Sequence, residues 1–103
     1  MKYREPLGNP RVGVLTIALR LPGCDSLKNK RSILRRLFSE LQTGTNLSVA
    51  EIGDHDVPTA AVMGIVTINA RWPKVESVLK WATQRCRNHF DIDVVDEQVE
   101  RLI

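Results

Sequence analysis

The sequence predicts an α+β domain whose six elements follow in the order β-α-β-β-α-β. Residues alternate in character with a period of two over 11–21, which is typical of a strand with one buried face. Apolar residues instead recur with helical spacing over 27–42 and again over 72–90. The remaining segments read as three further strands: 47–53, 59–69 and 92–103.

The first strand has two unlike faces. Its odd positions are mostly large and apolar and predict the core side: Gly13, Leu15, Ile17, Leu19 and Leu21. Its even positions are smaller and end in a charge: Val12, Val14, Thr16, Ala18 and Arg20. This second face is half apolar, without the charged character of a fully solvated surface.

The first helix follows Pro22-Gly23, with Asp25 or Ser26 as its N-terminal cap and Gly44 just after its end. One arc of this helix is apolar and predicts the face that packs on the sheet: Leu27, Ile33, Leu34, Leu37, Phe38 and Leu41. Arg36 lies on the far side of the helix, where solvent is expected.

The later elements carry their own punctuation. Gly64, in the middle of the third strand, suggests a bulge or a close backbone approach. Pro73 suits the first turn of the second helix, and Phe90 is expected to close the apolar stripe of that helix. The apolar residues of the last strand change face between Val94 and Val95, which indicates a bulge or an early strand end.

This order most economically gives the ferredoxin-like arrangement, a four-stranded antiparallel sheet with both helices on one face. The other face of the sheet is then uncovered. We expect it to pair with a second copy of the chain as a homodimer, with a dimer face that contains Val12, Val14, Thr16 and Ala18.

Length and composition set the broad class. With 103 residues, the chain is expected to form one domain over 11–103 after a flexible N-terminal lead-in over 1–10. Two cysteines, Cys24 and Cys86, are too few for a disulfide framework, and no segment resembles a signal peptide or a membrane span. We expect a cytoplasmic protein whose net charge of +3 mildly favours anionic partners.

The start of the first helix is the sharpest chemical signal. Cations are disfavoured where helix N–H groups already concentrate positive charge, and the same end of a helix readily binds phosphate. Five cations are therefore the candidate anion- or RNA-binding residues: Arg20, Lys28, Lys30, Arg31 and Arg35. Lys30 points into the apolar arc, so it must snorkel, pair with an acid or reach an anion. The alternative is a solvated helix face whose cations pair with Glu51 or Asp54.

No constellation supports catalysis, so no catalytic residue, no metal and no cofactor is expected. Glu51, Asp54, His55 and Asp56 could offer metal ligands or acid–base groups, but such a cluster more often forms a polar turn. The predicted strands contain no aromatic residue, which disfavours base stacking on the sheet.

Three separated motifs resemble a known family. They are Leu19-Arg20-Leu21-Pro22-Gly23, Ser26-Leu27-Lys28-Asn29-Lys30-Arg31 and Val49-Ala50-Glu51-Ile52-Gly53-Asp54-His55-Asp56. Together they resemble the YlxP-like family of small bacterial proteins of unknown function, over roughly residues 11–103. Asn29 and Asp25 depart from residues common in that family. The resemblance implies a ferredoxin-like fold, no agreed catalytic residues and, by genomic association only, an RNA or ribosome context.

The leading functional hypothesis is a non-enzymatic, dimeric binding module for RNA or a ribosomal particle. The alternatives are a sensor for a small anionic ligand at the same helix end, and a protein-interaction domain that works through the open sheet face.

Overall fold

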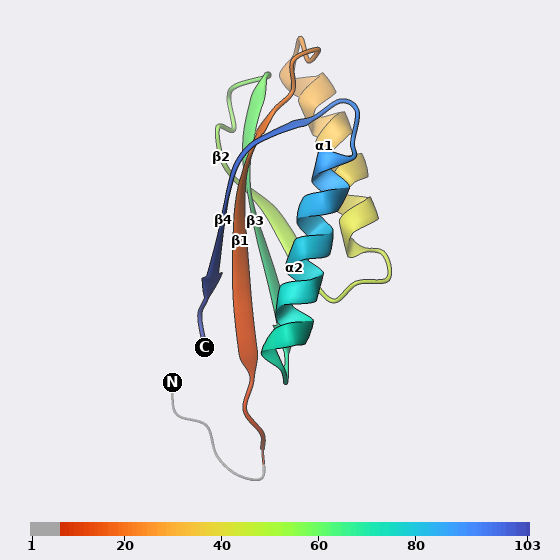
Figure 1. The fold of residues 1–103 in the computed structure, drawn as a ribbon. Coiled ribbons are helices and arrows are strands. Elements are labelled where there is room, and N and C mark those ends of the chain that lie inside the picture. The colour runs from red at the N-terminus through yellow and green to blue at the C-terminus, as the bar shows by residue number, and fades with distance from the viewer. Residues whose placement is uncertain (1–6) are drawn as a thin grey trace.

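The structure is a computed structural model that describes residues 7–103, so residues 1–6 of the expected lead-in lie outside it. The elements follow in the predicted order: β1 (Arg11–Arg20), α1 (Leu27–Gln42), β2 (Ser48–Gly53), β3 (Ala60–Asn69), α2 (Trp72–Arg87) and β4 (Asp93–Arg101). All three strand pairings are antiparallel, and both helices cover one face of the sheet (Figure 1). The ferredoxin-like fold is confirmed.

The sheet order is β2-β3-β1-β4, which leaves β2 and β4 at the edges. The long central strands β1 and β3 pair without interruption, and Thr16 lies opposite Gly64. Each β-α-β half of the chain places its helix over the same face. Within residues 7–103, no helix covers the opposite face of the sheet (Figure 1).

Two register shifts bend the edge strands. One lies in β4 at Val95, between the pairs Ala18–Asp96 and Leu19–Val94, and confirms the bulge expected there. The other lies in β2 at Ile52. Gly64 itself pairs regularly on both sides, so a bulge at Gly64 was wrong. The expected close approach is modest, because a Cβ at Gly64 would lie 3.4 Å from Cδ1 of Ile52.

The core lies between the sheet and the two helices. It contains the odd side chains of β1, the inward side chains of β3 and the apolar stripes of both helices, including Leu15, Ile17, Leu37, Met63 and Leu79. Ser26 is the N-terminal cap of α1, since its Oγ accepts a hydrogen bond of 3.0 Å from the N–H of Asn29. Satisfying this N–H fixes where the helix starts.

The structure places three side chains near the ends of elements. Phe90 does not close the stripe of α2: the helix ends at Arg87, and the ring is 92% exposed in the α2–β4 loop. Cys24 and Cys86 are both free thiols, and both are buried. Within residues 7–103, no helix is long and apolar enough to cross a membrane.

Candidate functional site

Lys30 is the most unusual side chain of α1, because it is a charged residue buried to 1% exposure. Its Nζ donates to the carbonyl oxygens of Asp54 at 2.7 Å and Ala60 at 3.0 Å, with that of His55 at 3.3 Å. Oε2 of Glu51 lies 2.8 Å from the same nitrogen. The ammonium is therefore fully occupied by the protein, as a buried charge requires.

The β2–β3 loop is shaped around this ammonium. Asp54 adopts a left-handed backbone conformation with φ 58°, which aspartate tolerates better than most residues. Nε2 of His55 lies 3.1 Å from the carbonyl oxygen of Glu51, which closes the turn. Loop carbonyls and the Glu51 carboxylate thus converge on Lys30 and fasten the start of α1 to the β2–β3 hairpin.

The expectation for Lys30 is revised accordingly. Of the three expected outcomes, the structure shows pairing with an acid: the Lys30 ammonium lies against the Glu51 carboxylate and donates to backbone carbonyls. No N–H group of this ammonium is left to bind a ligand. Its position in the middle of the apolar arc was the sequence signal for burial. The loop carbonyls that receive it come from a turn whose shape the sequence pattern did not reveal.

Three of the remaining expected cations, Lys28, Arg31 and Arg35, are exposed along one flank of α1, and we call them the cationic face. In the described part of the chain, none of the three forms an ion pair. Other exposed arginines do pair: Arg85 with Glu40, Arg87 with Glu97, and Arg101 with Glu76. Unpaired cations also occur elsewhere in residues 7–103, at Arg11, Arg20, Arg36, Arg71, Lys74 and Lys80. The cationic face is distinguished by the spacing of its three members, i, i+3 and i+7, which places them on one side of one helix.

Arg20 does not join the cationic face. Consecutive strand residues point to opposite sides, and Leu19 is buried beneath the helices, so Arg20 lies on the open side of the sheet. Its neighbour across the β1–β4 ladder is Asp93. The structure therefore separates Arg20 from the α1 cations by the thickness of the sheet.

A groove runs beside the cationic face, between α1 and β2. It has a volume of about 480 Å³ and is lined by Arg31, Leu34, Arg35, Phe38, Ser39, Gln42 and Glu51. The half-buried Phe38 gives this groove an aromatic wall next to two guanidinium groups. Sequence reasoning placed Phe38 in the core arc and missed this role, although its position at the edge of the arc was the available signal.

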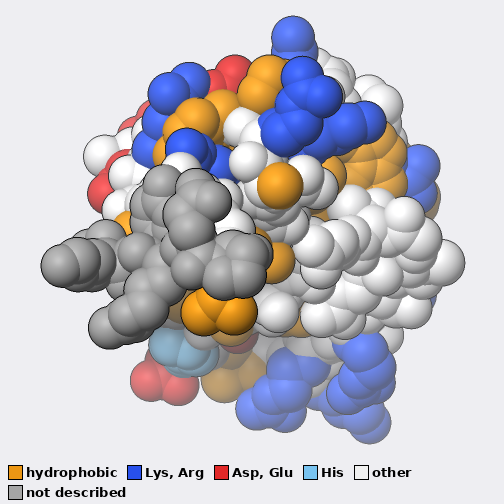
Figure 2. Space-filling view, turned by 90° about the horizontal axis from the view of Figure 1, so that it is seen from below, with side chains coloured by type: hydrophobic (Ala, Val, Ile, Leu, Met, Phe, Trp, Pro, Cys, Tyr) orange, Lys and Arg blue, Asp and Glu red, His pale blue; other side chains and the backbone are white. Residues whose placement is uncertain are grey.

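The positive charge of the molecule is not collected in one place. Seen from the end of the molecule where β1 begins, lysine and arginine side chains form separate groups around the periphery, with apolar side chains between them (Figure 2). Local arrangement, rather than the net charge of +3, therefore has to identify a binding surface.

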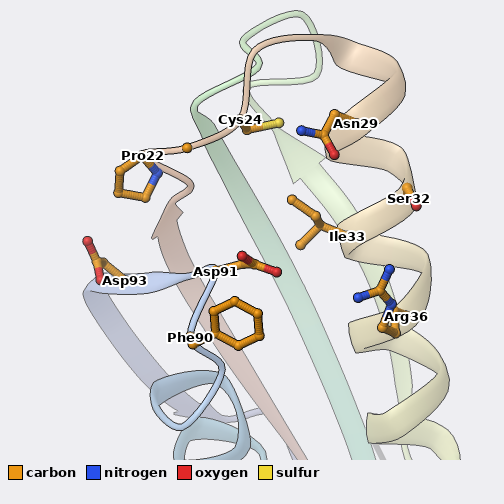
Figure 3. Close-up of a pocket in the computed structure, with 10 residues that line it drawn as sticks. Pro22, Cys24, Asn29, Ser32, Ile33, Arg36, Phe90, Asp91 and Asp93 are labelled. Carbon is orange, nitrogen blue, oxygen red and sulfur yellow. The ribbon is translucent and has the colours of Figure 1, made fainter.

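A second hollow lies on the other flank of α1, under the loops at one end of the sheet (Figure 3). It has a volume of about 370 Å³ and is lined by Pro22, Gly23, Cys24, Asn29, Ser32, Ile33, Arg36, Phe90, Asp91 and Asp93. Sequence reasoning treated Arg36 as merely solvated. The α2–β4 loop that faces it begins at Asn88, 52 residues further along the chain, and gave no local signal of this proximity.

The possible metal ligands Glu51, Asp54, His55 and Asp56 lie at the end of β2 and in the loop after it. Glu51 is paired with Lys30, and across residues 7–103 no group of three or more His, Cys, Asp or Glu side chains is arranged to hold a metal ion.

The thiol of Cys86 is buried, and this burial raises its pKa to about 11, so it is a poor nucleophile near neutral pH.

The open face of the sheet is apolar at its centre. The expected dimer-face residues Val12, Val14, Thr16 and Ala18 are half-buried within the sheet itself. Beside them Ile52, Val66 and Ile68 are 53%, 40% and 48% exposed. A second copy on this face remains a prediction.

The comparisons with known proteins place the chain in a family without describing a task. The family described as "Protein of unknown function (DUF503)" matches residues 12–99. No curated protein matches the sequence. The match carries no YlxP name, so that finer resemblance rests on the three motifs alone. Since the matched region covers most of the βαββαβ domain, the chain belongs to the DUF503 family of proteins of unknown function.

Proposed function

We propose that this protein is a non-enzymatic module that binds the phosphate backbone of RNA through the cationic face of α1. The observation that carries the proposal is that Lys28, Arg31 and Arg35, none of them ion-paired within residues 7–103, share one face of α1 beside a groove that two of them line. Helix positions that keep three neighbouring cations free favour a polyanion as partner, because each phosphate contact releases counterions.

The groove beside the cationic face supports a single-stranded partner. An unpaired base can lie against an aromatic ring while guanidinium groups hold the flanking phosphates. Arg31, Arg35 and Phe38 line one groove and supply both kinds of contact. Recognition of this sort depends on salt and selects weakly among sequences.

The test is the salt dependence of binding to a mixed-sequence single-stranded RNA, followed by fluorescence anisotropy. Three phosphate contacts give a slope of log affinity against log salt of about −2, because each contributes about −0.7 on a single strand. A variant with Lys28→Glu, Arg31→Glu and Arg35→Glu is expected to lose the binding. No RNA binding at low salt would refute the proposal.

A matched control separates a surface from a general charge effect. Arg71→Glu, Lys74→Glu and Lys80→Glu change the net charge equally at exposed positions on or next to α2. This control is expected to keep most of the affinity, and an equal loss in both triple variants would remove the assignment to α1. Arg20→Glu, on the other side of the sheet, is expected to leave the slope unchanged.

The same experiment addresses the small-ligand alternative. If the cationic face holds a single small anion, inorganic phosphate at millimolar concentration displaces RNA more strongly than chloride at equal ionic strength. Under the RNA proposal, the two salts compete according to ionic strength alone.

A further inference from the structure

The hollow shown in Figure 3 has features that RNA binding does not use, and we call it the loop pocket. Its walls come from two segments distant in sequence: the β1–α1 loop with the first turns of α1, and the end of the α2–β4 connection with the first residue of β4. Its volume of about 370 Å³ is of the size that small ligands occupy. It lies on the flank of α1 away from the groove that contains Arg31 and Arg35.

The loop pocket contains opposite charges that are not paired with each other. Asp91 extends its carboxylate toward α1, and the guanidinium of Arg36 projects into the same space (Figure 3). Within residues 7–103, neither side chain forms an ion pair. Because these two opposite charges share a hollow without pairing, a ligand could bind between them if it carries a negative group for Arg36 and a positive group for Asp91. Asp93, at the far rim, adds a second negative charge.

The pocket also has an apolar side. The Phe90 ring, 92% exposed, lies next to Asp91, and Ile33 contributes to the wall on α1. The only ring stacked on Phe90 in the described chain is that of its neighbour His89, at 6.0 Å between centroids. Contact between the exposed Phe90 ring and an apolar group of a ligand would stabilise the complex, because it removes apolar surface from water.

We propose that the loop pocket binds a free α-amino acid with an aromatic or large aliphatic side chain. Arg36 receives the α-carboxylate, since guanidinium matches carboxylate geometry, and Asp91 receives the α-ammonium. The side chain of the amino acid lies against Phe90 and Ile33. Asn29, whose side chain points toward Cys24 at the upper end of the pocket, offers an amide to the polar end of the ligand (Figure 3).

This site is independent of the proposed function. Its charged residues are Arg36, Asp91 and Asp93, whereas the cationic face consists of Lys28, Arg31 and Arg35. Amino-acid binding can therefore be tested in the cationic-face variant that loses RNA binding. RNA binding can likewise be tested in variants of the loop pocket.

The test is a titration of the isotope-labelled protein with L-phenylalanine, followed by backbone amide chemical shifts. We expect saturable shifts at Ser32, Ile33 and Asp91, and none at Val49 on β2. Phenethylamine lacks the carboxylate and 3-phenylpropionate lacks the ammonium, so each is expected to bind about tenfold or more weakly, because one charged contact is lost. L-alanine tests the apolar contact in the same way.

Variants assign the contacts. Arg36→Gln and Asp91→Asn are each expected to weaken L-phenylalanine about tenfold, while Arg35→Gln, one residue away but outside the pocket, leaves it unchanged. Phe90→Ser is expected to abolish the preference for L-phenylalanine over L-alanine. Absence of saturable shifts at the pocket in the unmodified protein overturns the proposal, and so does equal binding of L-phenylalanine and phenethylamine.

Discussion

Nζ of Lys30 lies 2.8 Å from Oε2 of Glu51, and this ion pair joins the first turn of α1 to the edge strand β2. The side chain of Lys30 is 1% exposed and that of Glu51 is 19% exposed. Water therefore screens the lysine charge very little and the glutamate charge in part. Carbonyl oxygens of Asp54, His55 and Ala60 complete the surroundings of the ammonium. Lys30, for which an anion was one of three expected partners, is therefore part of the protein's own framework.

Substitution of Lys30 by methionine is expected to destabilise the fold. Lys30→Met keeps the side-chain volume but leaves the Glu51 carboxylate without its counter-ion and three carbonyl oxygens without their donor. Loss of one partner of a buried pair costs about 3–5 kcal/mol, and partial exposure of Glu51 places the expected loss at the lower end, about 3 kcal/mol. Urea unfolding followed by tryptophan fluorescence measures it.

Lys28→Met provides the matched control, because Lys28 is exposed two residues earlier on the same helix. Surface substitutions of this type change the free energy of unfolding by about 0.5 kcal/mol or less. Similar unfolding midpoints for Lys30→Met and Lys28→Met would contradict the structural role of Lys30.

Gly13 sets the spacing between β1 and α2. A Cβ at this position would lie 2.6 Å from Cγ1 of Val75 and 3.0 Å from Cδ1 of Leu79, so these side chains or the helix that carries them would have to move. Gly13→Ala is expected to lower the free energy of unfolding by about 1–3 kcal/mol, the usual range for an overpacked core. Thermal unfolding detects the change.

Gly64→Ala is the counterpart in the other central strand. Its Cβ would make only an ordinary contact of 3.4 Å with Ile52 on the open face, and alanine restricts the unfolded chain. Gly64→Ala is expected to be neutral or stabilising, and a loss as large as that of Gly13→Ala would show that crowding beneath α2 is not the cause.

The fold was predictable from the sequence because its signals are local and agree with one another. The alternation in 11–21 marked the core side of β1, and Ser26 and Pro73 marked the two helix starts. Each of these signals acts within a few residues, through side-chain direction or a cap. Phe90 misled because its helical spacing continued past the point where α2 ends at Arg87.

The candidate site was predictable only in part, because its decisive contacts are distant in sequence. Exposure of Lys28, Arg31 and Arg35 follows from helical periodicity, but the fate of Lys30 depends on loop carbonyls at 54, 55 and 60. Arg20 was grouped with the helix by proximity along the chain, whereas strand alternation places it on the other side of the sheet. The loop pocket could not be predicted, because it forms only where the fold brings Phe90 and Asp91 back beside α1.

The buried thiol of Cys86 is expected to make the free energy of unfolding depend on pH in the alkaline range. Burial raises the pKa of its thiol from 9.0 to about 11 in the folded protein, so the unfolded chain ionises first. The contribution of this thiol is complete below pH 9 and is lost as the pH rises toward about 11, at about 1.4 kcal/mol per unit of pKa difference. Measured across this range, the free energy of unfolding should fall more steeply in the unmodified protein than in Cys86→Ala; equal slopes would contradict the assignment.

The open face of the sheet is expected to bring two copies together. Val14 on β1 lies opposite Val66 on β3, and exposed Ile52 and Ile68 extend the same apolar surface. Burial of such a surface against its copy removes it from water, so light scattering should give twice the chain mass of 11.6 kDa. Val14→Asp is expected to produce monomers, because a carboxylate cannot be buried unpaired in that interface. Val57→Asp, at an exposed position in the β2–β3 loop, should leave the dimer intact. A monomeric mass for the unmodified protein at high concentration would exclude this use of the face.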